Sequence, residues 1–195
     1  SSAIPAIASR PWQVRNEWIM KAPMNYNLGS AAVLAVLILL VMVTGARSEA
    51  RLGTYGEWEA FTDKDGGKIV CYIGSRPHKK QGKYKKRDLT YVLITHRPAD
   101  DPPSTNVLSV NAGYTYKNGS DVEISIGKEA FKLFTDSGHA FANNSETDNT
   151  LVKAMIRGTT MVVRGTSSRG TLTTDTYSLK GFTAAYKVIS KACKI

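Results

Sequence analysis

After Arg51, the chain is dominated by short stretches in which apolar and polar residues alternate. A period of two places successive side chains on opposite faces of a strand, as in Val122–Ile126, which follows a hairpin-type Asn118-Gly119 step. The stretch Leu89–Thr95 is apolar at both sets of positions, as expected of a strand that is covered on both faces. This pattern predicts a mainly β (α+β) fold built on an antiparallel sheet, as a β-sandwich or a distorted barrel.

Two stretches break the period of two and predict helices. The first is a short inserted helix, which follows the capping hydroxyls of Ser145 and Thr147 and stops at Gly158. The second runs from about Phe182 to Ala192, and its apolar stripe continues to Cys193. We therefore expect one inserted helix and one C-terminal helix packed on the sheet.

Near the N-terminus, thirteen apolar residues follow one another without a break from Ala31 to Val43. This length fits the apolar region of a signal peptide, whereas the eighteen residues 28–45 reach the lower limit of a membrane-spanning helix. The small residues Ser48 and Ala50 fit a signal-peptidase site before Arg51. Either interpretation predicts that the rest of the chain is exported.

The chain is accordingly divided into three parts by this apolar run. They are an upstream extension outside the fold (1–19), a signal peptide or single-pass membrane anchor (20–50), and one exported domain (51–195). If 28–45 is not cleaved, it provides contact with the membrane.

The net charge of the chain is +10, and without the four basic and two acidic residues before Arg51 the exported part carries +8. Such an excess favours anionic partners. The charge is densest in Arg76–Arg87, which has seven basic residues in twelve and no acid. We predict a solvated loop that either protects a sheet edge from pairing or binds anionic groups. The candidate anion-binding residues are Lys79, Lys80, Lys83, Lys85, Lys86 and Arg87, together with Arg169 from a hairpin.

The hairpin segment Gly165–Gly170 has the outline of a phosphate-binding loop, but Thr171 stands where such a loop needs lysine, and strands surround it. We interpret the segment as a turn held by bonds from side chains to the backbone. A small anion nest around Arg169 is the alternative.

The only two cysteines, Cys71 and Cys193, both lie in the part predicted to be exported. Cysteines in an oxidising compartment usually pair, so we expect a disulfide between the last helix and an early strand. A metal site is disfavoured because the sequence has no CxxC pair and no histidine at ligand spacing.

Several motifs in the exported part carry a family resemblance. They are Trp58, Cys71-Tyr72-Ile73, Tyr91–Pro98, Gly113–Tyr116, and above all Gly165–Phe182, with Ala192-Cys193 at the end. Together these residues resemble the invasion-associated locus B family over nearly all of 58–193. The resemblance implies an exported protein of Gram-negative bacteria, chiefly alphaproteobacteria, of which some members are linked to host-cell invasion. It implies no established reaction and no agreed set of binding residues.

The sequence contains no recognisable catalytic motif. Its three histidines, His78, His96 and His139, are scattered, and neither GxSxG nor HExxH is present. We therefore expect no enzymatic activity, no cofactor and no catalytic or metal-binding residues.

These observations predict a periplasmic or cell-surface interaction module. Its expected partner is a protein or an anionic envelope component, such as a lipid head group, lipopolysaccharide or an acidic glycan. Nucleic acid is disfavoured, because Tyr84 is the only aromatic residue in the basic run and export removes most such ligands. The alternatives are a membrane-anchored accessory subunit of an envelope complex and an envelope hydrolase.

Overall fold

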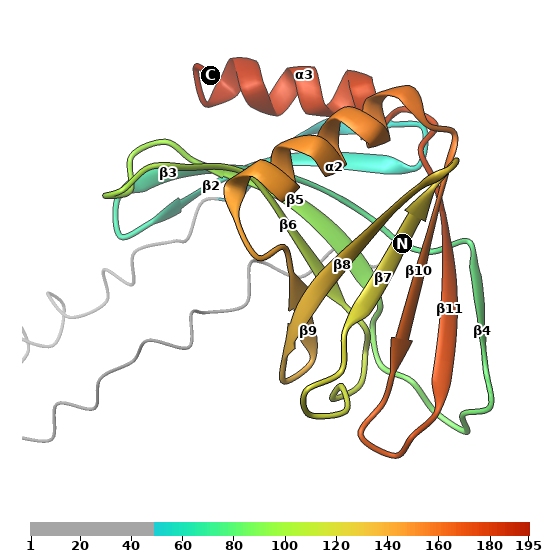
Figure 1. The fold of residues 1–195 in the computed structure, drawn as a ribbon. Helices are drawn as coiled ribbons and strands as arrows, with labels where there is room; N and C mark the ends of the chain where they lie inside the picture. Colours follow the sequence, from blue (N-terminus) through green and yellow to red (C-terminus); the bar gives the residue numbers. More distant parts are fainter. Residues whose placement is uncertain (1–48) are drawn as a thin grey trace, which may run out of the picture. The chain divides into compact units, whose positions relative to one another are not determined.

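The computed structural model describes residues 49–195, which form eleven strands and two helices (Figure 1). The strands are β1 (Ala50–Tyr55), β2 (Trp58–Asp65), β3 (Lys68–Ser75), β4 (Lys79–Gly82), β5 (Tyr91–Arg97), β6 (Ser104–Asn111), β7 (Val122–Ile126), β8 (Glu129–Asp136), β9 (His139–Phe141), β10 (Thr160–Thr166) and β11 (Leu172–Ser178). The helices are α2 (Ser145–Arg157), which follows β9, and α3 (Phe182–Ala192), which follows β11.

The strands form one open antiparallel sheet in the order β1-β2-β3-β5-β6-β9-β8-β7-β10-β11-β4. Its end strands are β1 and β4, so the sheet does not close on itself. The mainly β antiparallel fold with one inserted and one C-terminal helix is therefore confirmed. The loop predicted for the basic run is wrong in part, because Lys79–Gly82 forms strand β4 by pairing with β11.

The core lies on the face of the sheet that both helices cover. Trp58 of β2 packs edge-on against Phe182 of α3, with 4.9 Å between ring centroids, and its Nε1–H donates to the Ser178 carbonyl at 3.0 Å. Leu151 and Met155 bring α2 into the same cluster. Burial of each large apolar side chain contributes about 1.5–3 kcal/mol, so this shared core fixes both helices on the sheet.

The opposite face of β2, β3 and β5 is also apolar and buried. Its side chains, separate from the core cluster, are those of Phe61, Val70, Tyr72, Tyr91 and Leu93. Because side chains alternate along β5, Val92 and Ile94 enter the core while Tyr91 and Leu93 lie on this second face. The prediction of a strand covered on both faces is confirmed.

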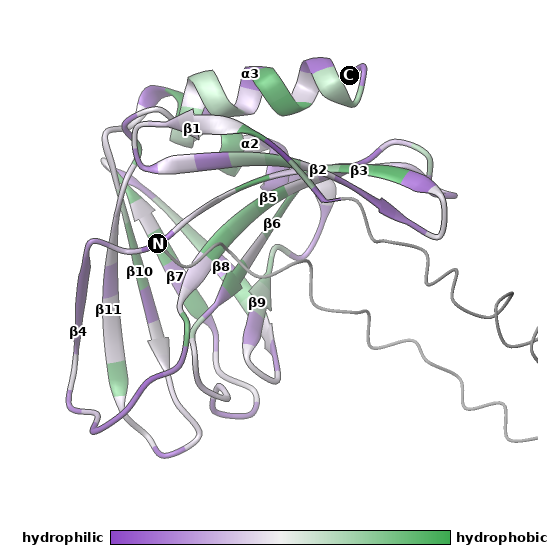
Figure 2. Ribbon diagram, turned by 180° about the vertical axis from the view of Figure 1, so that it is seen from behind, coloured by the Kyte–Doolittle hydropathy of each residue, from purple (hydrophilic) through white to green (hydrophobic). Residues whose placement is uncertain are grey.

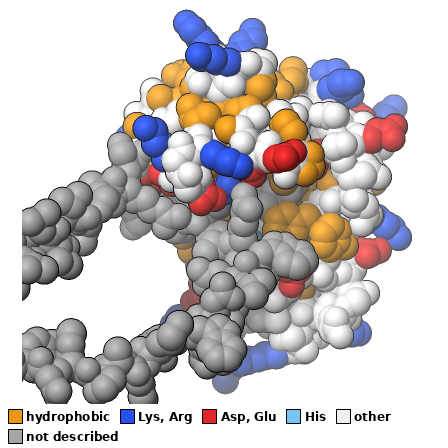
Figure 3. Space-filling model, turned by 90° about the vertical axis from the view of Figure 1, so that its left-hand side faces the viewer, with side chains coloured by type: hydrophobic (Ala, Val, Ile, Leu, Met, Phe, Trp, Pro, Cys, Tyr) orange, Lys and Arg blue, Asp and Glu red, His pale blue; other side chains and the backbone are white. Residues whose placement is uncertain are grey.

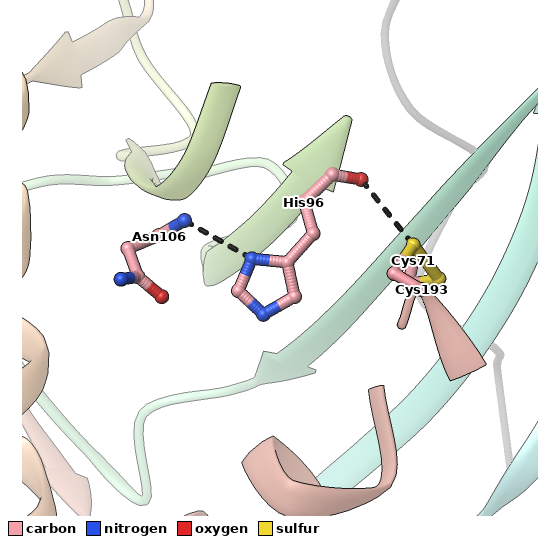
Figure 4. The surroundings of a disulfide bond; sticks show 4 residues. All are labelled: Cys71, His96, Asn106 and Cys193. Atoms are coloured by element: carbon pink, nitrogen blue, oxygen red, sulfur yellow. Dashed lines mark hydrogen bonds between the residues drawn. A yellow bond between two sulfur atoms is a disulfide. The ribbon is translucent and has the colours of Figure 1, made fainter. Parts of the chain in front are cut away.

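A disulfide joins the residue that directly follows α3 to strand β3 (Figure 4). Cys71 and Cys193 lie 6.0 Å apart between Cα atoms, which confirms the predicted pair. The Cys193 sulfur also contacts the His96 carbonyl oxygen at 3.9 Å, and His96 Nδ1 accepts from the Asn106 backbone N–H at 3.0 Å. The other end of α3 begins at Gly181, where φ is +90° and an added Cβ would lie 1.9 Å from the Tyr55 carbonyl oxygen.

The predicted upstream extension (1–19) and almost all of the predicted signal peptide or anchor (20–50) lie outside the described residues. Strand β1 begins at Ala50, next to the predicted cleavage position before Arg51. Within 49–195, neither helix has the length and apolar character needed to cross a membrane.

Candidate functional site

A basic pocket lies where three chain segments meet beside the β10–β11 turn. The segments are 83–88, which leads out of β4, 113–115, and 167–173 at the turn. The pocket encloses about 580 Å³. Figure 1 shows the turn and the segment that follows β4 at the same end of the sheet, and Figure 2 shows β4 and that segment as strongly hydrophilic.

The pocket brings together basic residues that are distant in the sequence. Lys83, Lys85 and Lys86 line one side, and Arg169 of the turn lines it as well. The carboxylate of Asp88 is the one acidic group in this lining. The basic run and the hairpin that carries Arg169, which are far apart in the sequence, therefore form a single site with an excess of positive charge.

Lys79 and Lys80 do not belong to that pocket lining. They are exposed neighbours on β4, so their side chains point to opposite faces of the sheet. Since β4 is an end strand, their position fits the simpler interpretation, in which lysines discourage edge-to-edge pairing.

Arg87 also lines the pocket, but its guanidinium is almost fully buried and has an internal partner. Its side chain is 2% exposed and forms a bidentate pair with the Asp175 carboxylate, with N–O distances of 2.7 and 2.5 Å. Its Nε–H donates to the Ala112 carbonyl at 2.6 Å. Burial opposes the charge of Arg87, but the hydrogen bonds to Asp175 outweigh it and raise the pKa of Arg87. The Arg87 guanidinium is therefore neutralised by the Asp175 carboxylate inside the domain.

Two aromatic rings complete the surroundings of this guanidinium. The Arg87 Cζ atom lies over the Tyr84 ring at 5.5 Å from its centroid and over the Tyr114 ring at 4.9 Å. The Tyr114 hydroxyl is hydrogen-bonded to that of Thr173 at 2.7 Å. Burial raises the pKa of Tyr114, so it remains a neutral phenol and adds no negative charge to the pocket.

The β10–β11 turn is held by local hydrogen bonds, as the sequence predicts. The Thr171 backbone N–H donates to Ser167 Oγ at 3.1 Å. The Ser168 N–H donates to the Thr115 carbonyl at 2.8 Å, which ties the turn to the segment beside it. These bonds hold the turn so that Arg169 lies at the pocket. Because the turn joins two strands, it provides no helix N-terminus for a phosphate-binding loop.

The histidines do not converge on this pocket. His78 is exposed before β4, His96 is buried beneath α3, and His139 lies on β9 next to Asn111, with 3.1 Å between His139 Nε2 and Asn111 Nδ2. In the part of the chain that the structure describes, no three His, Cys, Asp or Glu side chains are grouped as metal ligands would be.

Asp175 is the functional neighbour that sequence reasoning missed. It is 2% exposed and anchors the basic segment through Arg87. A lone acid in the Thr-rich strand Leu172–Ser178 is the signal that could have indicated a buried cation partner.

The described part of the chain is a disulfide-bonded, mainly antiparallel β domain with a basic pocket at one end of its sheet. The family model described as "Invasion associated locus B (IalB) protein" matches residues 58–190, and the chain belongs to this family. This confirms the resemblance, and the IalB family is not a known enzyme family.

Among solved structures, the chain is similar to invasion associated protein B from Bartonella henselae. The sequence identity is 14% and the TM-score is 0.49, and the match covers 74% of this chain and 97% of that chain. No curated protein matches the chain.

Proposed function

We propose that the protein is a non-catalytic binding module of the cell envelope that recognises an anionic envelope component through the basic pocket. The observation that carries this proposal is the convergence of Lys83, Lys85, Lys86 and Arg169 on one cavity with a single carboxylate, that of Asp88. Cations gathered in a concave site act together on one ligand, whereas lysines spread over a convex surface do not.

Positive charge alone does not single out this site. On the face of the molecule drawn in Figure 3, Lys and Arg side chains are spread out with hydrophobic side chains between them. The pocket differs because its cations share a hollow with hydroxyl groups of Ser168 and Thr171, which can donate to the same anion.

The proposed location is the periplasm or the cell surface of a Gram-negative bacterium. The Cys71–Cys193 disulfide supports export, because such bonds persist in oxidising compartments. The apolar run Ala31–Val43 supports it independently. If that run stays attached, the protein is instead an accessory subunit at the inner membrane with its domain in the periplasm.

An envelope hydrolase is the less favoured candidate. Ser167 and Ser168 line the pocket, but no histidine is among its described lining residues, so neither serine has an imidazole base within that site. The proposal therefore assigns binding and no reaction.

The test is a charge reversal inside the pocket. The triple variant Lys83→Glu, Lys85→Glu and Lys86→Glu should lose about a hundred-fold or more in binding to isolated envelope fractions at low salt, since each of the three charges contributes about 1 kcal/mol near an anionic surface. Binding is measured by co-sedimentation of the purified native protein.

A control with the same change in net charge distinguishes the pocket from general attraction. The exposed residues Lys128, Lys153 and Lys187, all changed to Glu, should alter binding by no more than about two-fold. Equal losses in both triple variants would mean that binding follows net charge, and the pocket would lose its proposed role.

A further inference from the structure

The pocket offers more than charge. Tyr84 stands between Lys83 and Lys85 in the lining and is half-buried, while Thr115, Ser168 and Thr171 add hydroxyl groups around the same cavity. An aromatic face, hydroxyls and cations together match a ligand that has its own hydroxyl groups, a weakly polar ring face and a negative charge.

Tyr84 is held in place from inside the domain. Its ring lies over the Arg87 guanidinium, which is itself fixed by the Asp175 carboxylate and the Ala112 carbonyl. A side chain whose position is set before binding loses little conformational entropy when a ligand packs against it. The buried ion pair therefore supports an aromatic wall of the pocket.

The size of the cavity favours a small organic molecule over an inorganic anion. A volume of about 580 Å³ is in the range typical of small-molecule sites, and an inorganic phosphate would leave most of it unfilled. Hydroxyl, ammonium and guanidinium groups are distributed around the lining among apolar atoms, so an acyl chain would cover several polar groups without bonding them.

We infer that the pocket binds an acidic saccharide, a sugar that carries a phosphate or carboxylate group, with the sugar ring against Tyr84 and the charge beside Lys83, Lys85, Lys86 and Arg169. This inference rests on the proposed function and specifies its ligand. The hydroxyls of Ser168 and Thr171 face the same cavity and would bond the sugar or its charged group.

The experiment compares probes that separate the parts of such a ligand. The purified native protein is titrated with glucose 1-phosphate, glucuronate, inorganic phosphate and glucose, and amide shifts are followed by NMR. Glucose 1-phosphate or glucuronate should bind at least about five-fold more tightly than inorganic phosphate or glucose. Phosphatidylglycerol vesicles are the arm that tests a lipid head group as the source of the anion.

Variants at Tyr84 test the role of the ring. Tyr84→Ala should weaken the acidic sugar by about five-fold and leave inorganic phosphate binding unchanged, whereas Tyr84→Phe should keep the wild-type affinity within about two-fold. Unchanged phosphate binding also shows that the Tyr84→Ala pocket is still folded.

The outcomes separate this inference from the proposed function. If the acidic sugars bind no better than inorganic phosphate and Tyr84→Ala changes neither, the saccharide assignment is overturned while a basic anion site remains. If only the vesicles bind, the ligand is a lipid and the saccharide assignment is again overturned. If no probe binds and the triple pocket variant also keeps full envelope binding, both proposals fail.

Discussion

At the scale of single residues, the buried pair of Arg87 and Asp175 is a contact whose disruption should be costly. Asp175→Asn removes the compensating charge from a guanidinium that is 2% exposed. Loss of one partner of such a pair typically costs about 3–5 kcal/mol, because the remaining charge is buried without compensation. We expect a loss of this order in the free energy of unfolding, measured by urea denaturation.

The exposed residue Asp121 provides the control for this change. It lies 3.7 Å from Lys132 in a pair of which both members are more than half exposed. Asp121→Asn should cost no more than about 1 kcal/mol. If Asp175→Asn were no more costly than this, the ion pair would not be what anchors the basic segment.

The place of Arg87 could not be predicted from the basic run. All seven cations in Arg76–Arg87 look alike in sequence, and the partner that buries one of them is 88 residues away. The three pocket lysines were predictable as candidates because the density of charge is visible in the sequence, and Arg169 because it lies in a hairpin turn. The convergence of these four residues on one pocket depends on long-range strand pairing, which the local sequence pattern does not predict.

The second residue-scale prediction concerns the imidazole of His96. Burial lowers the pKa of His96 from 6.5 to about 4, and its Nε2 is buried without a hydrogen-bond partner among the described residues. Because the unfolded chain takes up the proton more readily, stability is complete above about pH 6.5 and falls as the pH drops toward 4, by up to about 3 kcal/mol.

His96→Asn is the informative variant, since an amide oxygen can replace Nδ1 as acceptor for the Asn106 N–H and does not titrate there. Its unfolding free energy should vary less between pH 7 and 4 than that of the wild type. His78→Asn changes an exposed histidine and should leave the wild-type curve intact. Parallel curves for wild type and His96→Asn would show that His96 does not cause the acid sensitivity.

At the scale of elements, strand β4 shows where sequence patterns stop being informative. The residues Lys79–Gly82 are all exposed and carry no apolar alternation, so the sequence predicted a loop. They form a strand because β11, more than ninety residues later, supplies hydrogen-bonding partners in register, with Lys80 opposite Asp175. Helices α2 and α3 were predictable because their apolar stripes are local. The predicted capping hydroxyls are corrected, because the side chain that caps α2 is that of Asn144, which accepts the Thr147 N–H.

Helix α2 is docked to the sheet through a buried carboxylate. Asp148 accepts the Leu108 N–H of β6 at 2.9 Å, and burial raises the pKa of Asp148 to about 6, an effect that this hydrogen bond partly opposes. A raised pKa means that its contribution to stability is complete below about pH 3.8 and is lost as the pH rises through 6.

Asp148→Asn keeps an acceptor for Leu108 and removes the buried charge. Its unfolding free energy, compared with the wild type, should therefore improve by about 1–3 kcal/mol between pH 4 and pH 8. Denaturant unfolding at the two pH values measures this difference. A difference that is the same at both pH values would contradict a titrating role for Asp148.

Helix α3 is fixed at its far end by the disulfide. Replacing Cys71 and Cys193 together by Ala should lower the free energy of unfolding by about 2–5 kcal/mol, because the unfolded chain regains the freedom lost by closing a loop of 122 residues. The comparison is made by denaturant unfolding of the oxidised wild type and the double variant. Wild-type stability in the double variant would show that core packing alone holds α3.

At the scale of the whole molecule, the fold class was accessible from the sequence and the sheet order was not. Period-two alternation indicated antiparallel strands, and the paired cysteines indicated which ends of the domain meet. The order in which β4 lies beside β11, and β9 between β6 and β8, depends on long-range packing. That order creates the pocket, because it brings the segment after β4 to the β10–β11 turn.

The last prediction concerns the mature molecule and its location. If the leader is removed before Arg51, the intact mass of protein isolated from envelope extracts should correspond to a chain that begins there, with β1 shortened only by Ala50. The same material, unfolded without reductant, should show no free thiol, because Cys71 and Cys193 are bonded. A mass that includes 28–45 would instead favour the anchored subunit, and two free thiols would contradict export of the domain to an oxidising compartment.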